Sequence, residues 1–140
     1  MKGKKKRKKE AKLVPKILVV EDEHIVAMDI QFTLETLGYK VCGIVSSGEE
    51  SVEKAFRINP DLILMDIKLK GKMDGISAAR QIQSKVKIPV IYLTAFGDEN
   101  TLKELAVTQP YGYINKPFVE HELQVKIEKI LKNFENCQFN

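Results

Sequence analysis

Short runs of apolar residues alternate along this chain with longer stretches in which apolar residues recur every three or four positions. Apolar runs of four or five residues between polar ones are typical of strands buried on both faces, and the longer recurrence is typical of amphipathic helices. The runs predict five strands, at about residues 17–20, 41–45, 62–65, 90–93 and 111–114.

The recurring pattern predicts a helix after each of these strands. The last helix has the clearest pattern, because Leu123, Ile127, Ile130 and Phe134 follow one another at spacings of four, three and four residues. Gly38 follows the first helix and is expected to cap its carboxyl end. The predicted helices span about residues 24–37, 48–58, 75–85, 98–107 and 119–134.

This alternation predicts an α/β domain in which helices cover both faces of a parallel, doubly wound sheet. Phe32, Phe56 and Phe134 occupy apolar positions of the predicted helices, so we expect them in the core. Ligands of such sheets bind beyond the carboxyl ends of the strands, near the point where the strand order reverses. The residues that follow the predicted strands are therefore the first candidates for a functional site.

Composition narrows the class of protein. The chain has 140 residues, enough for one domain with its own core, and 44% of them are hydrophobic and 30% charged. Its apolar runs are too short to cross a bilayer, and no apolar stretch of a secretory signal follows the basic start. The two cysteines, Cys42 and Cys137, lack metal-binding spacing. We therefore expect a cytoplasmic protein without membrane insertion, zinc or disulfides.

The positive charge of the chain lies at its start. Residues 1–16 contain nine of the 23 Lys and Arg and one of the 19 Asp and Glu, so they carry a net charge of +8, and residues 17–140 carry −4. A lysine run without an apolar face predicts a disordered basic tail over residues 1–14. It would either contact an anionic partner, such as nucleic acid, or only increase solubility.

Charged and hydroxyl side chains follow four of the predicted strands. Carboxylates that converge at one sheet edge repel each other unless a cation is present, and oxygen ligands of this kind suit Mg²⁺. A lysine and a hydroxyl nearby would suit a phosphoryl group. The residues concerned are Glu21, Asp22 and Glu23 after the first strand, Asp66 after the third, Thr94 after the fourth, and Asn115 and Lys116 after the fifth.

Asp66 is the best candidate nucleophile among these carboxylates. It ends the most apolar strand, which is often central in a doubly wound sheet, and a carboxylate can carry an acyl phosphate. The clustered acidic residues 21–23 are better suited to sharing a metal. Each residue also has a purely structural reading, for example as a helix cap or a turn residue. Their occurrence in one order at successive strand ends favours a shared site.

These residues resemble those of the receiver domain of two-component response regulators. The resemblance rests on Glu21-Asp22, Asp66, Thr94-Ala95 and Lys116-Pro117-Phe118 in this order, and it covers about residues 15–134. It implies a flavodoxin-like sheet with strand order 2-1-3-4-5. Residues 135–140 would form a short tail, which leaves no room for an output domain and leads us to expect a stand-alone receiver.

The resemblance assigns the chemistry to individual residues. Asp66 would accept a phosphoryl group from a sensor histidine kinase or a phosphotransfer protein. Mg²⁺ would be held by Glu21, Asp22, Asp66 and the backbone carbonyl of Lys68, and Lys116 would bind the phosphoryl oxygens. The domain would act as a signalling switch that catalyses only its own phosphorylation and dephosphorylation.

The resemblance also implies a conformational switch. Thr94 would move toward the phosphoryl group, Tyr113 would turn inward with it, and the peptide bond before Pro117 would be cis. The helix after Thr94, the fifth strand and the last helix would form the responding surface. That surface would contact a downstream protein or a second copy of the chain.

The sequence departs from the family pattern at a few positions. The first acidic residue is Glu21, where Asp is also common, and the loop over residues 68–74 is one residue longer than usual. Lys68 and Phe96 occupy the positions that tune the phosphoryl lifetime, and a cation beside a bulky ring predicts a long-lived phosphorylated state. An alternative is a Mg²⁺-dependent phosphohydrolase, but Lys68 stands where such enzymes place a second Asp.

Overall fold

The computed structural model describes residues 14–95, 98, 100, 103 and 111–139. Five parallel strands form one sheet in the order β2-β1-β3-β4-β5, which confirms the predicted strand order. The most apolar strand is central, as expected. The strands are β1 (Lys16–Val20), β2 (Lys40–Val45), β3 (Leu62–Asp66), β4 (Val90–Thr94) and β5 (Tyr111–Asn115).

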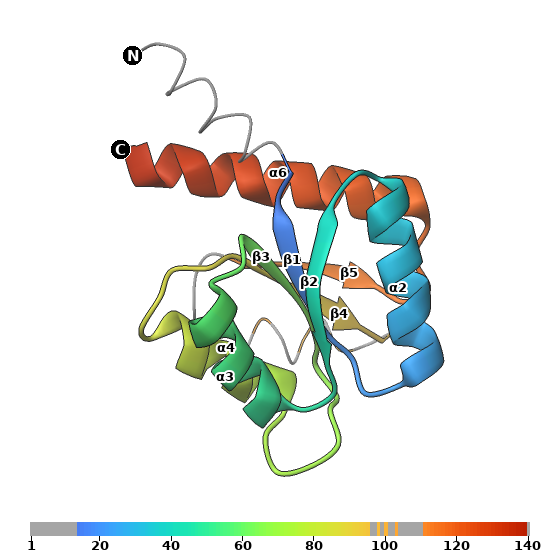
Figure 1. Cartoon of the computed structure of the whole chain (residues 1–140), viewed down its shortest axis with the longest axis vertical. Helices are drawn as coiled ribbons and strands as arrows, with labels where there is room; N and C mark the ends of the chain where they lie inside the picture. Colours follow the sequence, from blue (N-terminus) through green and yellow to red (C-terminus); the bar gives the residue numbers. More distant parts are fainter. Residues whose placement is uncertain (1–13, 96–97, 99, 101–102, 104–110, 140) are drawn as a thin grey trace.

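Helices cover both faces of the sheet (Figure 1). Helices α2 (His24–Thr36) and α6 (Glu120–Phe139) lie on one face, and α3 (Gly48–Ile58) and α4 (Gly75–Gln83) lie on the other. The helix predicted over residues 98–107 falls almost entirely outside the described residues. Helix α6 begins where the pattern predicts and continues through residue 139, beyond the expected end at 134.

The core consists of two apolar clusters separated by the sheet. Alternate residues of β1 belong to different clusters, because side chains alternate across a strand. Ile17 and Val19 pack with residues of α2 and α6, and Leu18 and Val20 pack with residues of α3 and α4. Every residue of β3 is buried, as expected for the central strand of a doubly covered sheet.

Local sequence signals fix the ends of the helices. Ser47 caps α3 by accepting a hydrogen bond from the backbone N–H of Glu50, and Asp74 caps α4 in the same way with Ser77. Gly38 follows α2 with a φ of 95°, in the left-handed region that favours glycine. Its predicted role at the carboxyl end of this helix is confirmed.

The prediction that three phenylalanines lie in the core is wrong for Phe32 and Phe56, and Phe134 belongs to neither of the two clusters described above. Phe32 is 71% exposed and Phe56 is 40% exposed, whereas Phe134 is half-buried. Helix α2 carries apolar residues on two sides, and the side with Ile30 and Leu34 packs on the sheet. The side with Phe32 therefore faces solvent.

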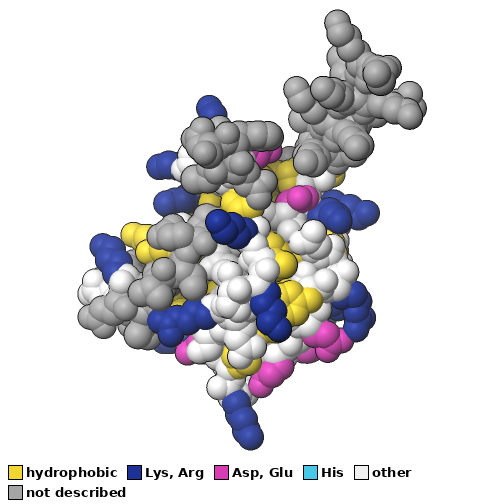
Figure 2. All heavy atoms as spheres, turned by 90° about the vertical axis from the view of Figure 1, so that its left-hand side faces the viewer, with side chains coloured by type: hydrophobic (Ala, Val, Ile, Leu, Met, Phe, Trp, Pro, Cys, Tyr) yellow, Lys and Arg dark blue, Asp and Glu magenta, His cyan; other side chains and the backbone are white. Residues whose placement is uncertain are grey.

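The surface carries separate charged groups. Figure 2 turns the left-hand side of Figure 1 toward the viewer, and Lys and Arg side chains are spread across that face rather than gathered in one patch. Among the described residues, no helix is both long enough and apolar enough to span a membrane.

Candidate functional site

The carboxyl ends of the strands bring the predicted site residues to one edge of the sheet. Val20 pairs with Met65, Asp66 with Leu93, and Thr94 with Asn115, so the ends of neighbouring strands lie at one level. Glu21 therefore follows β1 beside the end of β3, and Lys116 follows β5 on the same edge. The convergence expected from a parallel sheet is present.

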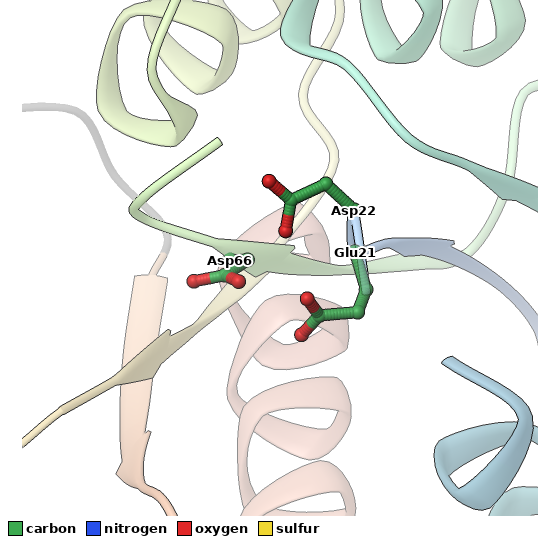
Figure 3. Close-up of side chains that lie close together, drawn as sticks. All are labelled: Glu21, Asp22 and Asp66. Carbon is green, nitrogen blue, oxygen red and sulfur yellow. The ribbon is translucent and has the colours of Figure 1, made fainter. Parts of the chain in front are cut away.

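Three carboxylates lie together at this edge (Figure 3). Oxygens of Glu21, Asp22 and Asp66 lie within 4.8 Å of one another. Glu21 is 2% exposed and Asp66 is 7% exposed, so two of the three groups are out of bulk water. Carboxylates crowded in a partly dry site repel each other, and a hard divalent cation with oxygen ligands would relieve that repulsion. The donor set therefore fits Mg²⁺.

Backbone N–H groups orient each of these carboxylates. The N–H of Lys68 donates to Oδ1 of Asp66 at 3.2 Å, and the N–H of Lys70 donates to Oδ2 of Asp22 at 3.1 Å. Glu21 accepts from the N–H of Glu23 through Oε2 at 3.1 Å. The loop after β3 thus holds two of the carboxylates in place, a contribution that residue spacing does not reveal.

Lys116 bridges two of the carboxylates. Its Nζ donates to Oε1 of Glu21 at 2.9 Å and to Oδ2 of Asp66 at 3.1 Å. Burial alone would lower the pKa of Lys116, but the hydrogen bonds to Glu21 and Asp66 outweigh burial and raise its pKa. Lys116 therefore stays protonated and partly neutralises the site.

Burial makes Asp66 an unusual aspartate. Burial is the largest cause that raises the pKa of this carboxyl, the charge of Lys116 opposes it, and the charge of Glu21 adds to it, so the pKa lies at about 6 instead of 3.8. The carboxylate is still mostly ionised at neutral pH. A charged group held against its burial penalty is typical of functional sites.

Thr94 is completely buried at the end of β4, and its hydroxyl is directed toward β5. It donates to Oδ1 of Asn115 at 2.6 Å, and the carbonyl oxygen of Ile114 lies 3.3 Å away. Tyr113, which also lies on β5, is half-buried, and the Nζ of Lys126 is 5.5 Å from the centre of its ring. The bond to Asn115 was not anticipated, although a polar residue beside Lys116 at a strand end was visible in the sequence.

Lys68 has an exposed side chain, unlike the groups of the inner site. Its Nζ lies 3.8 Å from Oδ1 of Asp98, and Oδ2 of the same carboxylate accepts a hydrogen bond from the backbone N–H of Ala95 at 3.2 Å. Asp98 was not singled out from the sequence. Phe96, the predicted partner of Lys68 in tuning the phosphoryl lifetime, lies outside the described residues.

Two backbone features complete the site. The peptide bond between Lys116 and Pro117 is cis, as the resemblance implies. Gly75, at the start of α4, lies against the end of β3, where an added Cβ would be 2.0 Å from the carbonyl oxygen of Asp66. Only glycine allows this approach. Sequence reasoning gave Gly75 no role, although its place directly after the capping Asp74 marked the start of a helix.

Comparison with known proteins gives one consistent family. A family model described as the response regulator receiver domain matches residues 17–128. The transcriptional regulatory protein PdtaR of Mycobacterium tuberculosis is 35% identical over 119 residues, which cover 85% of this chain and 58% of that protein. The alkaline phosphatase synthesis transcriptional regulatory protein PhoP of Bacillus subtilis is 39% identical over 122 residues, covering 86% of this chain and 50% of PhoP.

Solved structures support the same family. The receiver domain of the sensor histidine kinase PA1611 from Pseudomonas aeruginosa PAO1 superposes with a TM-score of 0.75 at 33% identity, over 85% of this chain and 98% of that one. That crystal structure contains a magnesium ion coordinated in its active site cleft. This chain spans only about half the length of the curated relatives it matches.

Proposed function

This chain belongs to the response regulator receiver domain family, and we propose that within this signalling family it acts as the phosphoacceptor of a two-component phosphorelay. The observation that carries the proposal is the contact of Lys116 with both Glu21 and Asp66 at the carboxyl end of the central strand. In this arrangement a buried nucleophile, an acidic group of ligands and a cation for the phosphoryl oxygens share one small volume.

In the proposed reaction, a carboxylate oxygen of Asp66 attacks the phosphorus of a phosphohistidine on the donor protein. The new bond joins that oxygen to phosphorus, and the phosphorus–nitrogen bond breaks, so the imidazole leaves with its electron pair and takes up a proton. Lys116 offsets the negative charge on the phosphoryl oxygens. Because the pKa of Asp66 is about 6, the attacking form predominates at neutral pH.

The residues that would hold Mg²⁺ are Glu21, Asp22, Asp66 and the backbone carbonyl of Lys68. Bound there, the ion would supply charge neutralisation for the phosphoryl oxygens during transfer. Support comes from the three crowded carboxylates and from the magnesium in the related PA1611 receiver. The backbone of Lys68 already lies next to Asp66 through its N–H bond.

Phosphorylation would then switch the domain. Thr94 would exchange its bond to β5 for one to the phosphoryl group, and Tyr113 would turn inward. The affected surface would comprise the helix predicted over residues 98–107, β5 and α6. A local exchange of hydrogen bonds biases such an element between two states. Lys68 and Phe96 would shield the acyl phosphate from water and lengthen its lifetime.

The partners follow from this cycle. A sensor histidine kinase or phosphotransfer protein would supply the phosphoryl group, and a downstream protein or a second copy of this chain would recognise the switched surface. We propose residues 15–134 as the receiver and residues 1–14 as a basic tail that could add contact with nucleic acid. On this proposal the domain transforms no substrate other than itself.

Incubation with acetyl phosphate, with and without Mg²⁺, tests the proposal by intact mass. Wild type should gain one phosphoryl group only with Mg²⁺, and Asp66→Asn should gain none. Asp61→Asn is the matched control, because Asp61 flanks the opposite end of β3, so its adduct should equal that of wild type. Absence of an adduct from wild type would reject the phosphoacceptor role. Rapid phosphate release through many turnovers would favour a phosphohydrolase instead.

A further inference from the structure

Thr94 and Asn115 are partners across β4 and β5. They occupy paired positions in the register of these parallel strands, so their side chains project on the same side of the sheet. The hydroxyl of Thr94 donates to Oδ1 of Asn115 at 2.6 Å, the short end of the range for such bonds. Thr94 is fully buried, whereas Asn115 is exposed at the strand end.

A threonine hydroxyl has a single proton to donate. In this structure that proton is directed to β5, where Asn115 is the near acceptor and the carbonyl oxygen of Ile114, at 3.3 Å, is the distant one. A hydroxyl that binds Asn115 cannot at the same time donate to a phosphoryl group on Asp66. The two bonds are therefore alternatives.

We infer that Asn115 is a positioning residue that holds the Thr94 hydroxyl on β5 and so stabilises the resting state of the switch. The inference rests on the proposed function, because the bond to Asn115 would oppose the proposed movement of Thr94 toward the phosphoryl group. Asn115 acts through Thr94, from whose hydroxyl its Oδ1 accepts a hydrogen bond.

The neighbouring residue makes this arrangement effective. Lys116 contacts Asp66 and Glu21, and its backbone N–H donates to the carbonyl oxygen of Thr94 at 2.7 Å. Two consecutive residues at the end of β5 thus bind the nucleophile and the switching hydroxyl separately. A phosphoryl group on Asp66 would replace both the bond between Thr94 and Asn115 and the bond between Lys116 and Asp66. Phosphorylation would therefore change the contacts of two consecutive residues at the end of β5.

Three variants test the inference with beryllium fluoride and Mg²⁺ as a phosphoryl analogue. Asn115→Leu keeps the size of the side chain but removes the acceptor, so the resting state loses one hydrogen bond and the analogue should bind about 2- to 10-fold more tightly. Asn115→Asp keeps an acceptor and should bind the analogue no more tightly than wild type. Gln81→Leu, which replaces an exposed amide on α4 by the same side chain, should leave the affinity unchanged.

A second measurement uses the protein without metal or analogue. The methyl resonance of Thr94, followed by NMR with labelled threonine, should shift in Asn115→Leu toward its position in the analogue-bound protein and should stay in place in Asn115→Asp. Unchanged or weaker binding in Asn115→Leu, with an unmoved Thr94 methyl signal, would overturn the inference and show that the carbonyl of Ile114 suffices. Failure of the proposed function appears separately, as wild-type protein without a phosphoryl adduct.

Discussion

Two aspartates flank the central strand, and their surroundings differ. Asp61, just before β3, is exposed, and its Oδ2 accepts a hydrogen bond from the backbone N–H of Lys16 at 2.8 Å. Asp66, the last residue of β3, is buried beside two other acidic residues and shares Lys116 with Glu21. The side chains are chemically identical. The difference teaches that the edge of the sheet at which an aspartate lies decides its burial and its charged neighbours.

The two edges differ in the same way as these aspartates. A cavity of about 280 Å³ lies at the amino edge, where apolar side chains such as Ile88 and Leu131 and charged ones such as Asp61 and Lys87 line it together. The carboxyl edge instead brings together a carboxylate cluster and a shared ammonium. The amino edge thus has an open cavity of mixed lining, and the carboxyl edge has three carboxylates packed together with one ammonium group.

The largest expected effect comes from removing the shared cation. Lys116→Met leaves Glu21 and Asp66 buried without their shared cation, so we expect a loss of about 3–5 kcal/mol in the free energy of unfolding at pH 7. The exposed Lys87 at the amino edge provides the control, since Lys87→Met should change stability by less than about 0.5 kcal/mol. Urea unfolding of both variants measures the difference. Equal losses would show that the two edges are not electrostatically distinct.

Glycines at the two edges should also differ. Gly75→Ala places a methyl group 2.0 Å from the carbonyl oxygen of Asp66 and should cost about 2–3 kcal/mol, because backbone has to move. Gly38, which leads into β2 at the amino edge, has nothing within 4 Å of an added Cβ but a φ of 95°. Gly38→Ala should therefore cost only about 1 kcal/mol. Thermal unfolding followed by circular dichroism tests the order, and a greater loss at Gly38 would contradict it.

The smallest expected effect is a dependence of stability on pH. The pKa of Asp66 is raised to about 6 in the folded protein from 3.8 in the unfolded chain, so protonation favours the folded state. Without metal, this contribution is complete below about pH 4 and is lost as the pH rises through 6. Urea unfolding at pH 5 and pH 7 should show it, and Mg²⁺ should restore stability at pH 7.

Two variants assign this pH dependence to one end of β3. Asp66→Asn should flatten the profile between pH 5 and pH 7, because its amide does not titrate. Asp61→Asn should keep the wild-type profile. A profile that persists in Asp66→Asn would mean that another group, rather than Asp66, titrates in this range.

The strands and the convergence of the site follow from the sequence for simple reasons. A strand buried on both faces, such as β3, must be apolar until it reaches the sheet edge, as it is over its first four residues, and parallel strands must place their carboxyl ends together. The same reasoning fails to predict which side of α2 is buried, because this helix has two apolar sides. Periodicity does not reveal that Ile30 faces the sheet and Phe32 faces solvent.

Individual contacts within the site were beyond sequence reasoning. The bond from Thr94 to Asn115 depends on strand register, and the bond from the N–H of Lys70 to Asp22 depends on the path of a loop. The close approach of Gly75 to Asp66 depends on the packing of α4 against β3. Residue type and spacing indicate which side chains share the candidate site. The hydrogen bonds that orient those side chains depend on register, loop path and packing, which the sequence pattern does not reveal.

Helix α6 is disproportionately long for the sheet beneath it. Its 20 residues give a length of about 30 Å, whereas a five-residue strand spans about 17 Å. The helix starts four residues after Lys116 and extends past the edge of the sheet (Figure 1). Because the helix is long and begins near the site, a small tilt at its start moves its far end much further. A tilt of about 5° at Glu120 would displace the far end by roughly 2.5 Å. On the proposed switch, a sub-ångström adjustment near Lys116 would therefore become a displacement large enough for a partner protein to recognise.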